Sequence, residues 1–419
     1  MNWRQPAPGA KMALHRLSLR RIHGAMKKST TLAQAGRHPS DQHGFVNPPV
    51  YRGSTIIHPS LAALEEASAH RFDRIYYGRF GTPTSFAFEE AMVALDGGYR
   101  AVAVSSGMAA ITAALLAFTG AGDHILVTDS AYYPTRALCG ALLARFGVET
   151  TFYDPLIGAD IAEHLRPDTR LVFTESPGSH SFEVQDIPAI AAAAHDAGAL
   201  VVLDNTWSAG LLFPAFARGV DISVQAATKY VVGHSDAMLG TISVANEDQF
   251  DSVKKTVVGL GNCPGSEECS LGLRGLRTLD VRLRRHQENG LTLARWLAQR
   301  PEIRRVMHPA LPEDPGHALW RRDFTGAPGL FGVVLDREYP RAAIAAFIDG
   351  LEVFSLGASW GGFESLVLPF TPATARSATT WSDPSPTLRF HAGLEDPEDM
   401  IADLERGFAR LEAAAADAA

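Results

Sequence analysis

Short apolar runs alternate with Ala-rich segments through the middle of the chain. The segments between most of the runs have the spacing of amphipathic helices, as over Ile187–Ala197. The runs themselves are rich in β-branched residues and have the length of buried strands: Ala101–Val104, Ile125–Val127, Leu171–Thr174, Leu200–Leu203 and Ile222–Val224. Strand and helix in alternation predict an α/β fold with a mostly parallel sheet and helices on both faces.

The pattern changes after about residue 276. Two segments, Arg284–Arg300 and Pro397–Ala414, predict amphipathic helices. Strand-like runs at Leu330–Leu335 and Leu388–His391 complete a smaller α+β domain. We therefore expect three regions along the chain: an N-terminal arm at 1–80, the α/β domain at 81–276 and the α+β domain at 277–419.

Composition excludes several protein classes. The chain has 419 residues, of which 46% are hydrophobic and 20% charged, values typical of a globular protein with a large core. Its net charge is −8, whereas nucleic-acid binders usually carry a basic surface, so we expect no nucleic-acid partner. The three cysteines (Cys139, Cys263 and Cys269) form no CxxC pair. We expect no structural metal site, no disulfide scaffold and a cytoplasmic location.

Two segments raise the question of targeting. Residues 101–122 carry no charge and are long enough for a membrane span, but interruptions such as Ser105 and Gly107 favour a buried strand feeding a buried helix. The first 40 residues contain no acid and several basic residues, which an organellar transit peptide would share. A solvated basic arm, or an upstream start codon with Met26 as the natural start, is the favoured interpretation. We expect no membrane association.

Polar residues just after the buried strands are the main functional candidates, because parallel sheets bind ligands outside the carboxyl ends of their strands. Asp204 ends the run LVVLD, where a carboxylate needs a cation or hydrogen-bond donors; the alternative is a helix cap. Gly107 opens a helix after AVAVSS, and the amides there can hold a phosphate. Lys229 follows an apolar strand, and a desolvated lysine can form a Schiff base; the alternative is a lysine whose amine reaches solvent.

These three features together suggest one cofactor. Asp204 and Lys229 are separated by one strand–helix–strand unit, so we expect them at the same edge of the sheet. An acid, a phosphate cradle and an amine match the three handles of pyridoxal 5′-phosphate (PLP): the pyridinium nitrogen, the phosphate and the aldehyde. The chain lacks the GxGxxG and GxxxxGK[ST] motifs of larger nucleotide sites.

At this point the sequence resembles the Cys/Met-metabolism family of PLP enzymes, and within it the bacterial cystathionine β-lyases. The resemblance runs from about Met26 to Leu411, through motifs that include MKKSTTLAQAGRHP, YYGRFGTPT, ESPGSHSFEVQDIPAI, DNTWSAG, QAATKYVVGHSDAMLGT and HAGLEDPEDMIADLERGFARL. It implies a fold-type I PLP enzyme with a seven-stranded, mostly parallel sheet and a smaller C-terminal domain.

The resemblance also implies how the cofactor is held. Lys229 matches the lysine that carries the aldehyde as a Schiff base, and Asp204 matches the partner of the ring nitrogen. The phosphate contacts match Gly107, the amide of Met108 and the hydroxyl of Thr228. Tyr77 and Arg79 match a pair that reaches the phosphate of a neighbouring subunit, so the active sites are expected at a dimer interface within a homotetramer.

Four further residues match substrate-facing positions of the family. Tyr132 matches a tyrosine that stacks on the cofactor ring and shuttles protons, and Arg389 matches the arginine that binds the substrate α-carboxylate. Ser359 and Trp360 are expected to line the same pocket. The implied chemistry is β-elimination, in which L-cystathionine yields homocysteine, pyruvate and ammonia within methionine biosynthesis by transsulfuration.

Two departures from the family pattern leave alternatives open. Val258 and Ala358 stand near positions where the family's β-lyases often carry tyrosines. The substrate is therefore open: γ-elimination, γ-replacement, or action on cysteine, cystine or an unusual amino acid are the alternatives. A PLP-binding protein without catalysis is a further alternative, which the retention of Arg389 beside Lys229 and Asp204 disfavours.

Overall fold

The computed structural model describes residues 26–417. Its large sheet has seven strands in the order β1-β7-β6-β5-β4-β2-β3. The pairs β2–β3, β2–β4, β4–β5 and β5–β6 are parallel, and β7 alone runs against its neighbours. The strands are β1 Arg100–Val104, β2 His124–Thr128, β3 Glu149–Tyr153, β4 Thr169–Glu175, β5 Leu200–Asp204, β6 Ile222–Gln225 and β7 Gly240–Val244. The seven-stranded, mostly parallel architecture is confirmed, as are all five predicted strands.

Helices cover both faces of this sheet because its strands are apolar on both sides. Val102 and Val104 of β1 pack in one cluster with helices α5 (Gly107–Leu116) and α8 (Glu247–Gly259). Ala101 and Ala103 of the same strand point the other way, onto α4 (Pro83–Asp96) and α9 (Ser266–Leu297). Helix α7 (Ile187–Asp196) covers the second face beside β4 and β5.

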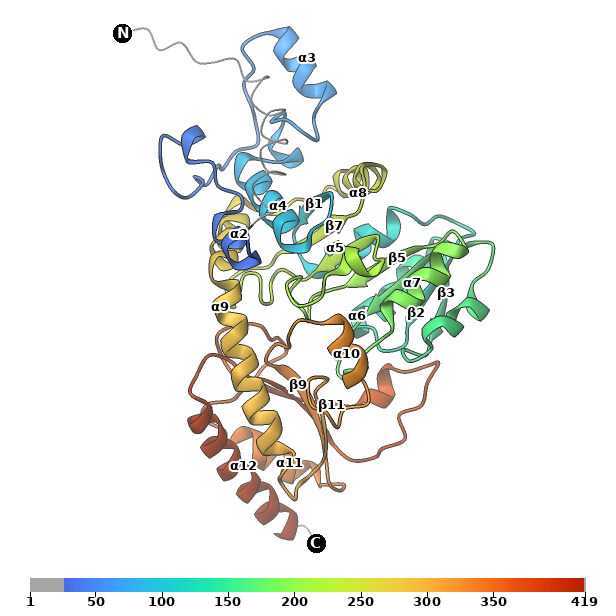
Figure 1. The fold of residues 1–419 in the computed structure, drawn as a ribbon, viewed down its shortest axis with the longest axis vertical. Helices are drawn as coiled ribbons and strands as arrows, with labels where there is room; N and C mark the ends of the chain where they lie inside the picture. The colour runs from blue at the N-terminus through green and yellow to red at the C-terminus, as the bar shows by residue number, and fades with distance from the viewer. Residues whose placement is uncertain (1–25, 418–419) are drawn as a thin grey trace.

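A second, five-stranded sheet forms the lower part of the molecule in Figure 1. Its order is β10-β11-β12-β9-β8, with β8 Ile303–Met307, β9 Leu330–Leu335, β10 Ser355–Leu356, β11 Leu366–Phe370 and β12 Thr387–His391. Helices α11 (Arg341–Asp349) and α12 (Pro397–Asp417) pack on it together with the end of α9. Two short helices lie between strands: α6 (Tyr133–Leu138) between β2 and β3 of the large sheet, and α10 (His317–Asp323) between β8 and β9 of the small sheet.

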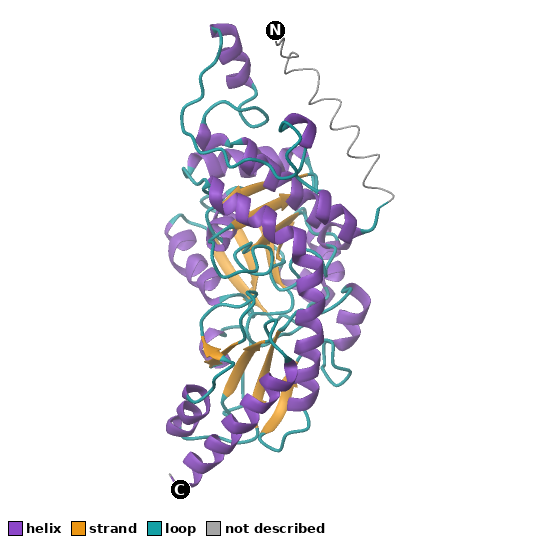
Figure 2. Ribbon diagram, turned by 90° about the vertical axis from the view of Figure 1, so that its left-hand side faces the viewer, coloured by secondary structure: helices purple, strands orange, loops and turns teal. Residues whose placement is uncertain are grey.

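The long helix α9 links the two sheets. It runs along the side of the molecule from the large sheet down to the small one (Figures 1 and 2). The predicted helix over Arg284–Arg300 is the second half of α9, which begins 18 residues earlier, at Ser266. The predicted division at residue 276 falls within this helix, and the three-region organisation stays a prediction.

The N-terminal segment extends away from the body of the molecule. Helix α2 (Lys28–Gln34) packs near α9, whereas α3 (Leu61–Ala69) projects beyond the large sheet (Figure 1). Several apolar side chains of this arm are exposed, including Phe45 (69%) and Ile57 (91%). Of the first 40 residues, whose composition raises the transit-peptide question, residues 1–25 lie outside the described residues.

The uncharged stretch 101–122 forms β1 and α5, as expected from its pattern. Across residues 26–417, no helix is both long and apolar enough to cross a membrane.

Candidate active site

A cavity of about 220 Å³ lies where the carboxyl ends of the central strands face the smaller sheet. The large sheet contributes the ends of β4 and β5 and the turns after β1 and β6. The C-terminal region contributes Ala358, Trp360, Leu330 and Arg389. Most of the residues predicted for the cofactor and substrate line this cavity: Gly107, Met108, Tyr132, Asp204, Thr228, Lys229, Trp360 and Arg389.

Lys229 lies in the turn that follows β6. Its amide donates to the carbonyl of Ala226 (3.0 Å) and its carbonyl accepts from Gly233, which adopts φ +72°. The side-chain Nζ donates to Ser359 Oγ (2.6 Å). Burial, then the nearby Arg389 guanidinium, lowers the pKa of Lys229 to about 8, with Asp204 opposing the shift. A substantial fraction of the amine is therefore neutral and nucleophilic near pH 8.

Two carboxyl groups lie side by side at the floor of the cavity. Asp204 ends β5, Glu175 ends β4, and the two residues are partners in the parallel register. Asp204 accepts hydrogen bonds from the amide (3.0 Å) and the hydroxyl (2.5 Å) of Thr206. Burial raises the pKa of Asp204, while those hydrogen bonds and the Lys229 charge oppose the rise. This carboxylate can face a protonated ring nitrogen.

Glu175 is a cavity residue to which sequence reasoning assigned no role. Burial raises the pKa of its carboxyl well above the usual range, and the Asp204 charge adds to the shift. Its Oε2 accepts the amide of Tyr132 (2.8 Å). Of two adjacent buried carboxyl groups, the one without cationic support holds the proton, so Glu175 is neutral and Asp204 keeps the charge. The rule of strand ends that found Asp204 applies equally to Glu175.

The start of α5 is where the sequence predicts a phosphate cradle. Ser106 caps this helix by accepting the amide of Ala109 (3.1 Å), which leaves the first amides, those of Gly107 and Met108, without intrahelical partners. A Cβ on Gly107 would lie 2.5 Å from the Cβ of Ala226, so this close approach requires glycine. Thr228 Oγ1 contacts Leu239, donating to its carbonyl (3.1 Å) and accepting its amide (2.8 Å).

The side chains of Arg389 and Lys229 both form hydrogen bonds to Ser359. Arg389 lies on β12, is 7% exposed, and donates through Nη2 to the carbonyl of Ser359 (2.9 Å). The hydroxyl of Ser359 contacts Lys229, and the ring of the adjacent Trp360 has its centroid 5.4 Å from Nζ. Burial lowers the pKa of Arg389 to about 10, so it stays protonated at neutral pH. A buried guanidinium beside an amine is suited to bind a carboxylate.

Tyr132, rather than its neighbour Tyr133, faces the cavity. Burial is the main cause that raises the pKa of the Tyr132 phenol, so this group stays protonated at neutral pH. Tyr132 precedes α6 and is 43% exposed, whereas Tyr133 is 61% exposed.

Tyr77 and Arg79 lie apart from the cavity of their own chain. They belong to the arm, and neither lines the cavity. Arg79 Nη1 donates to the carbonyl of Val258 (2.6 Å), and Tyr77 is 41% exposed. Val258, one of the two departures from the family pattern, therefore lies beside Arg79, whereas Ala358 lines the cavity.

The donor set fits PLP. An amine, a carboxylate that can face a ring nitrogen and unpaired helix amides converge on one cavity, and the guanidinium of Arg389 remains for a substrate carboxylate. Among the described residues, no group of three or more His, Cys, Asp or Glu side chains is placed to hold a metal ion.

Comparison with known families decides the assignment. The family model described as "Cys/Met metabolism PLP-dependent enzyme" matches residues 29–409. The chain belongs to this family. Its cofactor is PLP, and the protein is a PLP-dependent enzyme related to carbon–sulfur lyases.

Three relatives show the range of the family around this chain. The cystathionine beta-lyase of Escherichia coli is 44% identical and aligns over 92% of this chain and 99% of its own. The L-alanine/L-glutamate racemase of Wolbachia pipientis is 38% identical over 92% and 98%. A crystal structure of the cystathionine gamma synthase of Xanthomonas oryzae in complex with cystathionine has a TM-score of 0.85 at 32% identity, covering 93% and 99%.

Proposed function

We propose that this enzyme cleaves L-cystathionine by β-elimination into homocysteine, pyruvate and ammonia. The observation that carries the proposal is the joint contact of Lys229 and Arg389 with Ser359, at 2.6 Å and 2.9 Å. This contact sets a base beside a carboxylate-binding group, as proton removal from the Cα of an amino acid requires. The greater identity to the E. coli β-lyase than to the γ-synthase supports β-elimination.

The chain's own groups account for the steps around the cofactor. Arg389 binds the substrate α-carboxylate, and Trp360 lines the same pocket. When bound, PLP withdraws electrons from Cα, and Asp204 keeps its ring nitrogen protonated. Lys229 Nζ accepts the Cα proton, for which its lowered pKa is suited. The thiolate then leaves from Cβ, with Tyr132 as the candidate proton donor to the sulfur.

Product identification tests this proposal. Holoenzyme incubated with L-cystathionine is expected to release pyruvate and homocysteine in equal amounts, and the Lys229→Ala variant is expected to release neither. Borohydride reduction should attach the cofactor to Lys229 in the wild type. Formation of 2-oxobutyrate, or of a condensed amino acid with an added thiol, would instead establish γ-elimination or γ-replacement.

Racemisation is a second candidate, favoured by the 38% identity to the Wolbachia racemase. It needs the same Cα proton removal but returns a proton to Cα in place of releasing a leaving group. Incubation with L-alanine and L-glutamate, followed by chiral analysis, separates the two functions. A D-amino acid as the main product, without pyruvate from cystathionine, would favour the racemase.

The assembly is part of the proposal. We propose that Tyr77 and Arg79 complete the phosphate site of a partner subunit, so that two chains form the active unit and two such units form a tetramer. The support is that both residues lie outside their own cavity, on an arm with exposed apolar side chains. Cytoplasmic location and a role in methionine biosynthesis stay predictions.

A further inference from the structure

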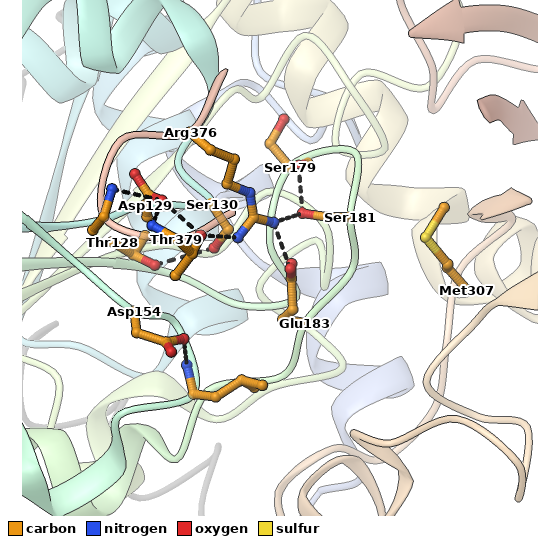
Figure 3. Close-up of polar contacts among 12 residues, drawn as sticks. Thr128, Asp129, Ser130, Asp154, Ser179, Ser181, Glu183, Met307, Arg376 and Thr379 are labelled. Carbon is orange, nitrogen blue, oxygen red and sulfur yellow. Dashed lines mark hydrogen bonds and ion pairs between the residues drawn. The ribbon is translucent and has the colours of Figure 1, made fainter. Parts of the chain in front are cut away.

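A segment of the C-terminal region reaches back to the large-sheet region beside the cavity. Arg376 lies in this segment, between β11 and β12, and its side chain is 7% exposed. It donates to Ser181 Oγ and forms an ion pair with Glu183, two residues of the loop that follows β4 (Figure 3). One guanidinium therefore bridges the C-terminal region and this loop.

The segment that carries Arg376 is itself held firmly. The carboxylate of Asp129, which directly follows β2, accepts the amides of Ser377 (2.9 Å), Ala378 (3.1 Å) and Thr379 (2.8 Å). Arg136 supplies a further hydrogen bond of 2.8 Å to the same carboxylate. Arg376 also donates through Nη1 to Thr379 Oγ1 (3.0 Å). The backbone segment that carries the Arg376 guanidinium is therefore held in place by Asp129 (Figure 3).

The loop at residues 177–183 needs such support because its backbone is strained. His180 (φ +66°) and Phe182 (φ +60°) both adopt the left-handed conformation, which is unfavourable for residues other than glycine. Backbone hydrogen bonds tie the loop at Ser179, to Ser130 (2.8 Å), and at Phe182, to Gly178 (3.0 Å). The two partners of Arg376 are Ser181, which lies between Ser179 and Phe182, and Glu183, which follows Phe182.

The same loop forms a wall of the active-site cavity. Pro177, Gly178, Ser179, His180 and Phe182 all line it. The His180 ring lies 4.7 Å from the ring of Phe370 at the end of β11. Burial, then the charge of Arg389, lowers the pKa of His180 to about 4, so a neutral imidazole faces this side of the cavity.

We propose that Arg376 is a positioning residue that fixes this loop and thereby sets the shape of the pocket for the substrate side chain. The expected change in KM for cystathionine rests on the proposed lyase function. The expected change in the hydrogen exchange of the loop does not depend on it. An arginine is suited to the role because its planar fork can bind a hydroxyl and a carboxylate at once, which the single ammonium of lysine cannot do in the same geometry.

The first test compares Arg376→Ala and Arg376→Lys with the wild type as holoenzymes. Hydrogen exchange of a peptide covering 178–183 is expected to be faster in R376A and intermediate in R376K. With cystathionine, the KM of R376A is expected to rise about tenfold while kcat changes by less than about threefold, because the wall orients substrate without touching the reacting atoms. Unchanged exchange in R376A would overturn the proposal, whatever the substrate proves to be.

Arg304→Ala is the matched control. Arg304 holds the other end of the same segment through Asp383 (3.0 Å) but does not touch the loop. R304A is expected to leave the exchange of 178–183 and the KM unchanged.

A double variant separates positioning from stability. R376A leaves the half-buried Glu183 carboxylate without its partner, and R376A/E183A removes that charge. The double variant is expected to recover thermal stability while its KM stays high. Recovery of the wild-type KM together with stability would show that Arg376 has only a structural role.

Discussion

At the scale of single residues, the environment of Lys229 explains why this lysine can react. Its pKa is lowered to about 8, mainly because the side chain is buried. Only the neutral amine attacks an aldehyde, and the neutral fraction rises as pH rises through the pKa. We therefore predict that the rate at which the apo-protein recombines with PLP rises with pH and has its midpoint near 8, as followed by stopped-flow absorbance.

The control is the reaction of PLP with a small lysine derivative, measured over the same pH range. Its rates correct the protein's pH profile for the titration of PLP itself. An ordinary lysine has a pKa of about 10.4. If the recombination rate of the protein had a pH midpoint as high as that of the derivative, the prediction would be contradicted. The K229A variant should show no absorbance change from reaction of residue 229 with PLP.

Sequence reasoning located the residues that follow directly from strand ends. Asp204, Gly107 and Lys229 were found because each lies within a few residues of a buried apolar run, and a parallel sheet brings those positions to one edge. His180 and Arg376 lie in long loops, where neither periodicity nor spacing fixes position. Their contacts depend on tertiary packing that one sequence does not reveal.

At the scale of secondary structure elements, two strands of the large sheet escaped the pattern analysis. β3 reads ETTFY and lies at one edge of the sheet, with only Tyr153 buried, so it lacks an apolar run. β7 reads GTISV and begins with Gly240, which must be small because a Cβ there would lie 2.0 Å from the carbonyl oxygen of Ser106. Exposure in one case and backbone contact in the other override the residue preferences of strands.

Asp129 provides a test of how the C-terminal segment is attached. Burial works to raise its pKa, but hydrogen bonds from Thr379 and from the amides of 377–379 outweigh burial and lower it. The carboxylate therefore stabilises the fold above the ordinary pKa, and this contribution is lost as pH falls through the lowered value. We predict that Asp129→Asn reduces the free energy of unfolding by about 2 kcal/mol at pH 7.

Denaturant titrations of wild type and D129N at several pH values measure this difference. It is expected to shrink below about pH 4, where this carboxylate begins to protonate in the unfolded chain, and to be lost below the lowered pKa of the folded state. A difference that is constant with pH would mean that the charge of Asp129 does not hold the segment. Glu149→Gln is the control, because this exposed carboxylate pairs only at the surface, with Arg166 (2.6 Å).

At the scale of the whole molecule, one chain does not bring all the predicted cofactor residues together. Tyr77 and Arg79 lie on the arm, while the cavity proposed to bind the cofactor phosphate lies elsewhere in the same chain. The exposed side chains of Ile57 (91%) and Leu61 (69%) are on this arm as well. A second copy of the chain can cover these apolar residues and receive Arg79 at the same time.

Subunit mixing tests this composite site. Arg79→Ala and Lys229→Ala homo-oligomers are each expected to be nearly inactive, the first because the phosphate is weakly held and the second because the base is missing. After the two variants are unfolded together and reassembled, about a quarter of wild-type activity should return, since half of the random pairs are hybrids with one intact site. Mixing without reassembly is the control. If Arg79 served its own subunit, each hybrid site would still lack one of the two groups, and reassembly would restore nothing.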